Sequence, residues 1–336
     1  MTGIKFGAFY PRTTEKTYPY KPNGGIGPRE FAQRIEALGF DAFFTGESPI
    51  NRGASYEQFA VLSYAAAATD TLRVGSDILL MPLHHPIWVA REWGTLDLLS
   101  NGRTILGVGV GGDGAGQGPK QFDGFGIPLS ERGSRTDEGI EIVKKLWTED
   151  NVSHHGKHFN FDGVTMEPKP LQPGGPPIWI GGRPGGTETG PDGQLRKKSA
   201  TGAVRRTAVY GDVWHPFYMT PETYAQSVID IKEHAALIGR DISDMGWSHN
   251  FHFLMDKDYE TALDRAVGKA RYGHQHERER IAKYDILGNP DDCIKRLQDF
   301  VDAGVNYFVC QWSCEPDEVM AHCELIAKEV MPHFQK

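Results

Sequence analysis

Acidic and histidine residues that could do chemistry stand where apolar runs of the 336-residue chain end. In residues 41–48 a short apolar run leads directly to Glu47. A carboxylate at the end of a strand can orient a bound molecule or move a proton, and its plainer role is to cap the next loop. We therefore take Glu47 as a candidate catalytic and ligand-binding residue.

A second acidic residue, Asp77, lies inside the apolar run of residues 74–81. A carboxylate buried there must find partners or become neutral, so we expect Asp77 to face a ligand or to mark a distortion of the backbone. His84 and His85 follow, just before Pro86 at a predicted helix start. Histidines in this place more commonly order the loop than bind a metal.

Two glycine patterns suggest close approach of a ligand to the backbone. Gly107, Gly109 and Gly111 alternate along one strand, which removes side chains from one face and could let a flat ring lie there. The pattern superficially resembles a dinucleotide-binding turn, but the next 19 residues are typical of a loop and not of the helix that such a turn requires.

The second glycine pattern joins Gly181 and Gly182, at a strand end, to Thr201 and Gly202, at a helix start. Backbone N–H groups at both places could hold a phosphate. Between them, Arg183–Ala200 is rich in glycine and proline, so we expect a mobile lid over the phosphate end and no regular helix.

The elements that position these residues alternate between short β-branched or aromatic runs and amphipathic helical stretches, a pattern typical of a parallel sheet with crossover helices. Eight such strands favour an α/β fold, a (β/α)8 barrel forming a single domain over residues 1–336; an open doubly wound sheet is the alternative. The long stretches 112–130, 151–175 and 183–200 are expected as insertions in loops at the C-terminal face. The predicted strands are Ile4–Phe9, Asp41–Glu47, Arg73–Met81, Arg103–Gly111, Pro177–Gly182, Asp212–Phe217, Gly246–Met255 and Val305–Trp312. The clearest predicted helices are Pro28–Leu38, Tyr56–Ala68, Ile87–Leu99, Glu131–Trp147, Tyr224–Leu237 and Asp291–Ala303.

Composition excludes several partners. A net charge of −8 leaves no basic surface for nucleic acid, and no run of 18 apolar residues is present to cross a membrane. The N-terminal residues lack the pattern of a signal peptide, so we expect a cytoplasmic protein. The four cysteines crowd into the C-terminal segment without disulfide or zinc spacing, which predicts free thiols and no metal site.

Taken in order, several of these stretches resemble the bacterial-luciferase-like monooxygenase superfamily, whose members are (β/α)8 barrels that use FMN or the deazaflavin F420. The resemblance spans nearly the whole chain. It is carried by Gly39–Asp41 with Glu47, His85–Pro86, Leu96–Arg103, Leu106–Gly109, Arg132–Gly133 with Asp137–Glu138, Ile178–Gly182, Gly211–Asp212 with Trp214, and Asp302–Val305.

The resemblance implies where a reduced FMN or F420 would bind. It places Glu47 near the isoalloxazine ring or its deaza analogue, and it implies a bulged third strand behind the ring, often with a cis bond that does not involve proline. The residues implied there are Ser76, Asp77 and Ile78 on that strand, Gly109 and Gly111 at the ring edge, and Gly181, Gly182, Thr201 and Gly202 near the phosphate.

Two positions depart from the family pattern. Many members have a catalytic histidine after the acidic residue, where this chain has Ser48, and F420-dependent dehydrogenases place a glutamate where it has Gly112. A proton donor would then come from elsewhere, with His84, His215 and Tyr10 as candidates, or the reaction would need none.

Three functions follow from these observations. The leading one is a flavin-dependent oxidoreductase, a luciferase-like monooxygenase that oxidises a small organic substrate with reduced FMN and O2. The alternative on the same fold is an F420-dependent reductase or dehydrogenase, and a non-catalytic flavin-binding protein is the alternative of another class. The partners to be tested are a small-molecule substrate, a separate flavin or F420 reductase and a second copy of the chain.

Overall fold

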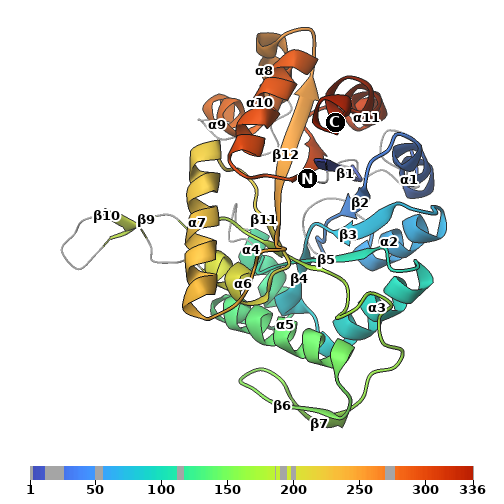
Figure 1. Cartoon of the computed structure of the whole chain (residues 1–336), viewed down its shortest axis with the longest axis vertical. Coiled ribbons are helices and arrows are strands. Elements are labelled where there is room, and N and C mark those ends of the chain that lie inside the picture. The colour runs from blue at the N-terminus through green and yellow to red at the C-terminus, as the bar shows by residue number, and fades with distance from the viewer. Residues whose placement is uncertain are drawn as a thin grey trace.

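A ring of parallel strands forms the centre of the computed structural model, which describes residues 3–11, 26–49, 56–111, 117–185, 187–189, 195–197, 202–268 and 277–335 (Figure 1). β11 pairs with both β8 and β12, which closes the ring, so the predicted (β/α)8 barrel is confirmed. The barrel strands are β1 (Lys5–Phe9), β2 (Ala42–Thr45), β3 (Arg73–Ser76) continued by β4 (Leu79–Leu80), β5 (Thr104–Gly109), β8 (Ile178–Gly181), β11 (Val213–His215), β12 (Gly246–Met255) and β14 (Tyr307–Trp312). A short strand, β13 (Ile286–Gly288), adds to β12.

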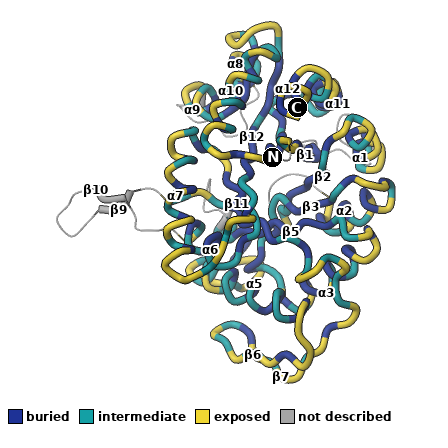
Figure 2. The backbone as a smooth tube through the Cα atoms, viewed as in Figure 1, coloured by how far each residue is buried: buried dark blue, intermediate teal, exposed yellow. Residues whose placement is uncertain are grey.

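Helices surround the strands, with their exposed residues outward and their buried residues toward the sheet (Figure 2). The six helices predicted from sequence are present within about three residues at each end. They are α1 (Pro28–Ala37), α2 (Gln58–Ala67), α3 (Pro86–Leu99), α5 (Arg132–Thr148), α7 (Pro221–Leu237) and α10 (Pro290–Asp302). The others are α4 (Gln117–Gly124), α6 (Gly202–Tyr210), α8 (Tyr259–Gly268), α9 (Glu277–Tyr284), α11 (Val319–Leu325) and α12 (Met331–Phe334).

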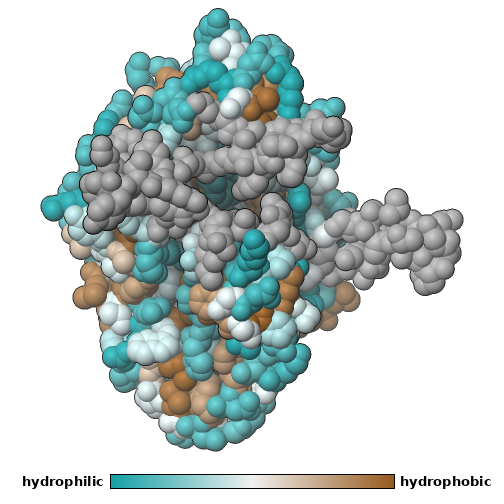
Figure 3. Space-filling model, turned by 180° about the vertical axis from the view of Figure 1, so that it is seen from behind, coloured by the Kyte–Doolittle hydropathy of each residue, from teal (hydrophilic) through white to brown (hydrophobic). Residues whose placement is uncertain are grey.

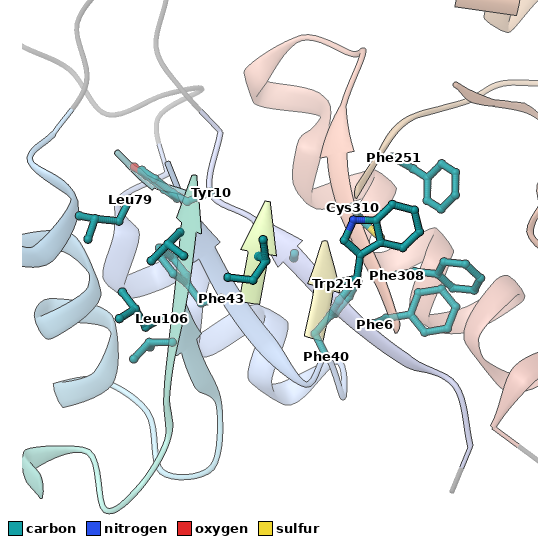
Figure 4. Close-up of a cluster of buried hydrophobic side chains, with 14 of the residues drawn as sticks. Phe6, Tyr10, Phe40, Phe43, Leu79, Leu106, Trp214, Phe251, Phe308 and Cys310 are labelled. Carbon is teal, nitrogen blue, oxygen red and sulfur yellow. The ribbon is translucent and has the colours of Figure 1, made fainter. Parts of the chain in front are cut away.

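The apolar residues form two cores because side chains alternate between the two faces of each strand. The larger core lies between strands and helices; Figure 4 shows Phe6, Phe251 and Phe308 gathered in one part of it, with ring centroids of Phe6 and Phe308 5.3 Å apart. The smaller core fills the barrel interior and comprises Phe9, Ala42, Phe44, Ile105, Trp179, Tyr307 and Val309. All four cysteines are free and buried, as predicted.

Glycine makes room for the central ring of the interior core. A Cβ atom added at Gly7 would lie 2.5 Å from the Phe44 ring, and one added at Gly75 would lie 2.6 Å from it. β1 and β3, which flank β2, therefore carry glycines at the positions toward which the Phe44 ring of β2 extends. We call this interior core the lower layer of the barrel.

Arg103 holds the end of the barrel where β3 and β5 begin. Its guanidinium donates hydrogen bonds to the carbonyl oxygens of Leu72 at 2.6 Å, Ala66 at 2.8 Å and Ser100 at 2.6 Å. These carbonyls belong to the C-terminal ends of α2 and α3 and to the residue before β3, so one side chain ties two helices to two strands.

Two of the predicted insertions differ from expectation. Residues 112–130 were expected to be loop, but α4 and a short 3-10 helix (Leu129–Glu131) lie there. Residues 151–175 were expected after a strand, but they follow α5, and their hairpin of β6 (Val152–His155) and β7 (Asn160–Val164) folds back along α5, where Glu138 accepts the backbone N–H of Phe159 at 2.8 Å. The amphipathic pattern of a helix as short as α4 is weak, so the sequence did not predict it. The sequence also does not show at which end of the barrel a helix such as α5 finishes.

The expected lid, Arg183–Ala200, lies largely outside the described residues and stays a prediction. Within it, β9 (Thr187–Thr189) and β10 (Leu195–Lys197) pair as two antiparallel strands. A two-stranded hairpin can satisfy its own backbone without apolar residues to bury, which the glycine and proline content did not reveal.

Candidate active site

The third barrel strand is interrupted at the predicted place. β3 ends at Ser76, the bond between Asp77 and Ile78 is cis, and β4 begins at Leu79. The Ser76 hydroxyl accepts the backbone N–H of Gly107 at 2.8 Å and donates to its carbonyl at 2.8 Å. A side chain thus replaces the backbone pairing of β3 with β5 where the strand bends, and the predicted distortion at Asp77 is confirmed.

The glycine face of β5 is filled by Ile78. A Cβ atom at Gly109 would lie 1.9 Å from the Ile78 Cδ1 atom, and one at Gly181 would lie 2.9 Å from the same atom. The prediction that a flat ring lies directly against the β5 glycines is therefore wrong for Gly109, and Gly181, which was predicted near the phosphate, also packs against Ile78. The glycines admit the isoleucine, and a flat ligand would instead meet the partly exposed side chain of Ile78.

Asp77 lies inside the barrel, with 7% of its side chain exposed. Its Oδ1 accepts from His215 Nε2 at 3.1 Å, and its Oδ2 accepts from the side-chain amides of Asn250 and, at 3.3 Å, Gln311. These donors come from β11, β12 and β14, across the barrel from the interrupted strand. Three hydrogen bonds to one buried carboxylate satisfy its oxygens and hold its position.

His215 is held from both ring nitrogens. Its Nδ1 lies 2.7 Å from the Ser248 hydroxyl, which donates in turn to the Trp214 carbonyl at 2.9 Å. Contacts at both ring nitrogens therefore fix the orientation of the imidazole. We call Asp77, His215, Ser248, Asn250 and Gln311 the upper layer of the barrel.

Glu47 and His84 form a pair at the ends of β2 and β4. His84 Nε2 donates to Glu47 Oε1 at 2.6 Å, and the backbone N–H of Leu80 donates to Glu47 Oε2 at 2.6 Å. The His84 side chain is 30% exposed and the Glu47 side chain 13%. Glu47 therefore anchors the loop after β4, which is its loop-capping role, and also places an imidazole beside its carboxylate.

Acidic neighbours shift the pKa of His84. Burial lowers the pKa of His84, but the hydrogen bond and charge of Glu47, with Glu92 and Glu57 further away, outweigh burial and raise that pKa above its usual value. Burial raises the pKa of Glu92, as do the charges of Glu57 and Glu47. The Glu47–His84 pair therefore holds a proton at higher pH than an isolated histidine does.

The glycine-rich strand end and helix start are adjacent, as predicted. A Cβ atom at Gly182, whose φ is +122°, would lie 3.1 Å from the Cβ atom of Ala203 in the first turn of α6. Further along α6, the Arg206 guanidinium is 4% exposed and donates to Asp137 at 2.5 Å. Gly202 begins α6, whereas Thr201 lies outside the described residues, as does Gly112.

Gly111 and Tyr10, also predicted as functional residues, have contacts that belong to the packing of the fold. Gly111 has a φ of +74° and lies at the turn from β5 toward α4, where a Cβ atom would be 3.0 Å from the Phe122 ring. Tyr10, a candidate proton donor, is buried in the outer core and donates to the Ile26 carbonyl at 3.1 Å, away from the barrel interior.

The structure thus divides the predicted residues into three groups: Asp77, Ile78 and His215 inside the barrel, Glu47 and His84 at its rim, and Gly181, Gly182 and Gly202 at the start of α6. The sequence did not single out Ser248, Asn250 and Gln311. The available signal was polar residues at inward-facing positions of strands otherwise rich in aromatic residues. Within the described ranges no group of three or more metal-ligating side chains is found.

The described helices are too short or too polar to span a membrane. On the face seen in Figure 3, hydrophobic residues lie in patches among hydrophilic ones.

Curated relatives align over most of the chain. An F420-dependent glucose-6-phosphate dehydrogenase of Amycolatopsis mediterranei is 26% identical over 318 residues, covering 84% of this chain and 88% of the relative. A 4-hydroxyprotoasukamycin monooxygenase of Streptomyces nodosus subsp. asukaensis is 25% identical over 371 aligned positions, covering 99% of this chain and 93% of the relative.

Solved structures share the fold. Monooxygenase RslO1 from Streptomyces bottropensis superposes with a TM-score of 0.75 at 21% identity, covering 98% of this chain and 100% of that one. An F420-dependent secondary alcohol dehydrogenase, in complex with an F420–acetone adduct, superposes with a TM-score of 0.76 at 20% identity, covering 99% and 100%. The family model described as luciferase-like monooxygenase matches residues 5–188, more than half of the chain, so the chain belongs to the luciferase-like monooxygenase family and is an oxidoreductase.

Proposed function

We propose that this chain is an F420-dependent oxidoreductase that transfers a hydride to or from a small organic molecule, with the Glu47–His84 pair as its proton donor or acceptor. The observation that carries the proposal is the 2.6 Å contact between His84 and Glu47. Two positions argued from the sequence against dehydrogenase chemistry, Ser48 where the family has a histidine and Gly112 where it has a glutamate. A histidine from the neighbouring strand end stands beside the acidic residue instead.

The chain offers residues that fit a deazaflavin or a flavin. Ile78 presents an apolar side chain over the glycine face of β5 and β8, which suits one face of a flat ring. Gly182 and the first turn of α6 offer backbone N–H groups to a phosphate, with no Cβ atom at Gly182 or Gly202 in the way. F420, when bound, supplies or accepts the hydride.

The work left to the protein is to move one proton for each hydride. Nε2 of His84 is bound to Glu47, so Nδ1 is the atom that would exchange a proton with the substrate oxygen. Glu47 stabilises the imidazolium formed when Nδ1 takes up a proton, and the raised pKa of His84 keeps that proton available near neutral pH. In the reducing direction the proton returns to the substrate oxygen.

His84→Asn tests this role. It should lower turnover by about 100-fold, within the usual contribution of general acid–base catalysis, while leaving the affinity for F420 nearly unchanged. The variant should also lose the limb of the pH–rate profile that His84 produces. The matched control is His85→Asn, since His85 follows directly but accepts the backbone N–H of Ile87 at 3.3 Å. A variant with full turnover would exclude His84 as the proton donor.

A luciferase-like monooxygenase that uses reduced FMN and O2 is the second candidate. It is favoured by the monooxygenase relative, whose alignment covers 99% of this chain. Titrating the purified protein with F420 and with FMN, in both redox states, separates the two. Tighter binding of F420 and its reduction without oxygen support hydride transfer, whereas tight binding of reduced FMN with oxygen consumption supports the monooxygenase.

The proposal also covers the partners, oligomeric state and location of the protein. A separate reductase that regenerates the reduced cofactor, a homo-oligomer and a cytoplasmic location are all compatible with the family. Light scattering of the purified protein tests the oligomer, and turnover with and without an added reductase tests the dependence on a second enzyme.

A further inference from the structure

The loop that carries His84, residues 81–85, is anchored to the barrel at two points. Glu47 accepts the backbone N–H of Leu80, just before the loop, and it accepts Nε2–H of His84 itself. Three residues separate these two contacts, and they form one turn of 3-10 helix in which His84 donates its N–H to the Met81 carbonyl at 3.2 Å. A single 3-10 turn is a weak support, so the place of His84 also depends on what packs against the loop from outside.

Helix α5 holds the loop from that outer side. Nε–H of Arg135 donates to the Pro82 carbonyl at 3.3 Å, and the Arg135 side chain is only 20% exposed. One turn further along α5, a Cβ atom at Gly139 would lie 2.5 Å from the Met81 Cε atom, so the methionine packs directly on the helix. One face of α5 therefore contacts two consecutive residues of the loop.

Phe159, in the turn of the β6–β7 hairpin, completes this outer support. The guanidinium carbon of Arg135 lies 5.1 Å from the centre of the Phe159 ring, which orients the cation. The His85 ring meets the same ring edge to face, with centroids 5.2 Å apart and an interplanar angle of 80°. Glu138 accepts the backbone N–H of Phe159 at 2.8 Å and so ties the turn to α5. Arg135 is therefore held in place where it meets the loop.

We propose that Arg135 is a positioning residue of the oxidoreductase: its hydrogen bond to the Pro82 carbonyl fixes residues 81–85 and so keeps the His84 imidazole against Glu47. The inference rests on the proposed function, since it names a residue that acts through His84. A misplacement of about 1 Å by a residue away from the chemistry can cost about 100-fold in rate, so one backbone contact is enough to matter.

The two neighbouring histidines allow charge and position to be separated. Burial lowers the pKa of His85, and the positive charge of Arg135 lowers it further. The main groups that outweigh burial at His84 and raise its pKa are three carboxylates: Glu47 at the end of β2, Glu92 on α3 and Glu57 before α2. Removing a positive charge raises the pKa of a nearby imidazole, so a fall in the pKa of His84 has to come from weaker contact with these carboxylates.

The test follows the imidazole resonances of His84 and His85 by NMR across pH in the purified chain, assigned with His84→Asn and His85→Asn. Arg135→Met removes the guanidinium and keeps a straight apolar side chain beside Phe159. The titration midpoint of His84 should then move to lower pH, while that of His85 moves to higher pH. In the assay used for His84→Asn, turnover should fall by about tenfold or more.

Two further variants serve as controls. Arg135→Lys keeps the charge but has no donor at the Nε position, so it should leave the His85 midpoint unchanged and still lower that of His84. Lys145→Met removes a charge about 15 Å further along α5, where Lys145 pairs with Glu141 at 2.7 Å, and both midpoints should stay as in wild type. Thermal unfolding checks that each variant is folded, and the milder Arg135→Lys decides the question if Arg135→Met is not.

A His84 midpoint that stays in place or rises in the Arg135 variants would overturn the proposal, because Arg135 would then act by charge or on stability alone. The titrations need neither substrate nor cofactor, so they are independent of the proposed function. Full turnover by His84→Asn would refute that function, whereas a lowered His84 midpoint in the Arg135 variants would still support the positioning of the loop.

Discussion

The lower and upper layers of the barrel interior are built on opposite principles. The lower layer is aromatic and aliphatic, and glycines on neighbouring strands give the Phe44 ring its space. The upper layer is polar, and hydrogen bonds from three strands converge on Asp77. Packing in the lower layer stabilises the fold without selecting a ligand, whereas the upper layer offers directed donors and acceptors at the end where (β/α)8 enzymes do chemistry.

The largest expected effect is in the lower layer. Phe44→Ala should cost about 4 kcal/mol of unfolding free energy, because a fully buried ring is removed and its neighbours cannot close the cavity. Chemical denaturation measures this loss. Leu237→Ala, at a side chain 83% exposed, is the control and should stay within about 0.5 kcal/mol of wild type. A cost below that of altering Asp77 would mean that the lower layer is not the better packed of the two.

Asp77 provides the corresponding test of the upper layer. Asp77→Leu should cost about 3 kcal/mol, since Asn250, Gln311 and His215 lose their shared acceptor, and Asp77→Asn should cost less because it keeps one acceptor oxygen. Denaturation of both variants gives the difference. If leucine were as well tolerated as asparagine, the Asp77 carboxylate would contribute only its volume and not its hydrogen bonds. The proposed difference between the two layers would then be wrong.

Ser76 lies in the barrel wall at the interruption of the third strand. Replacing it should cost less unfolding free energy than replacing Asp77. Ser76→Ala leaves the N–H and carbonyl of Gly107 without their partner, at a cost of about 2 kcal/mol. The control is Ser63→Ala, where a helical hydroxyl only adds to a carbonyl already in a helix. Equal stability of the two variants would show that the backbone closes the gap left by Ser76.

Two histidines should give the smallest effects, with opposite signs. Burial, with the nearby His215 as a smaller cause, holds the pKa of His249 well below its usual value, so its stabilising contribution is present above about pH 6.5 and is lost as pH falls below it. The pKa of His84 is raised, so its contribution is present below about pH 6.5 and is lost as pH rises through the folded-state value. Unfolding free energy measured across this range gives both slopes.

Variants separate the two histidine contributions. His249→Phe should flatten the pH dependence of the unfolding free energy on the acid side. Phenylalanine should fit there because the His249 ring already lies 3.9 Å from the Phe251 ring, among aromatic neighbours. Glu47→Gln should flatten the alkaline side, and it should also lower stability because Glu47 anchors Leu80. A Glu47→Gln variant that loses activity alone would favour the purely catalytic role expected from the sequence.

The sequence was sufficient to predict the barrel because each strand and helix has its own local period. It was also sufficient to predict distortion at Asp77, because an acidic residue in an apolar strand must have a cause. It could not identify what fills a glycine face: the absence of side chains at Gly109 and Gly181 is visible in the sequence, but the isoleucine that fills the space comes from another strand.

Pairings across the barrel were similarly hidden. Asn250 is 173 residues from Asp77, and no local pattern reports which inward positions share a level. The Glu47–His84 pair was within reach, since both residues follow strands that are neighbours or near neighbours in a barrel and such ends meet at one face. The pairing of β9 with β10 was not, because turn-rich composition does not show which short segments pair as strands.

The Arg103 clamp has a consequence for where this chain tolerates change. It ties α2 and α3 to the beginnings of β3 and β5, at the end of the barrel opposite the Glu47–His84 pair. Substitutions in the loops at the Glu47–His84 end therefore leave this anchorage untouched and need no compensating change in the frame. A library randomised at exposed positions of that end, such as Phe217, should accordingly retain many folded members.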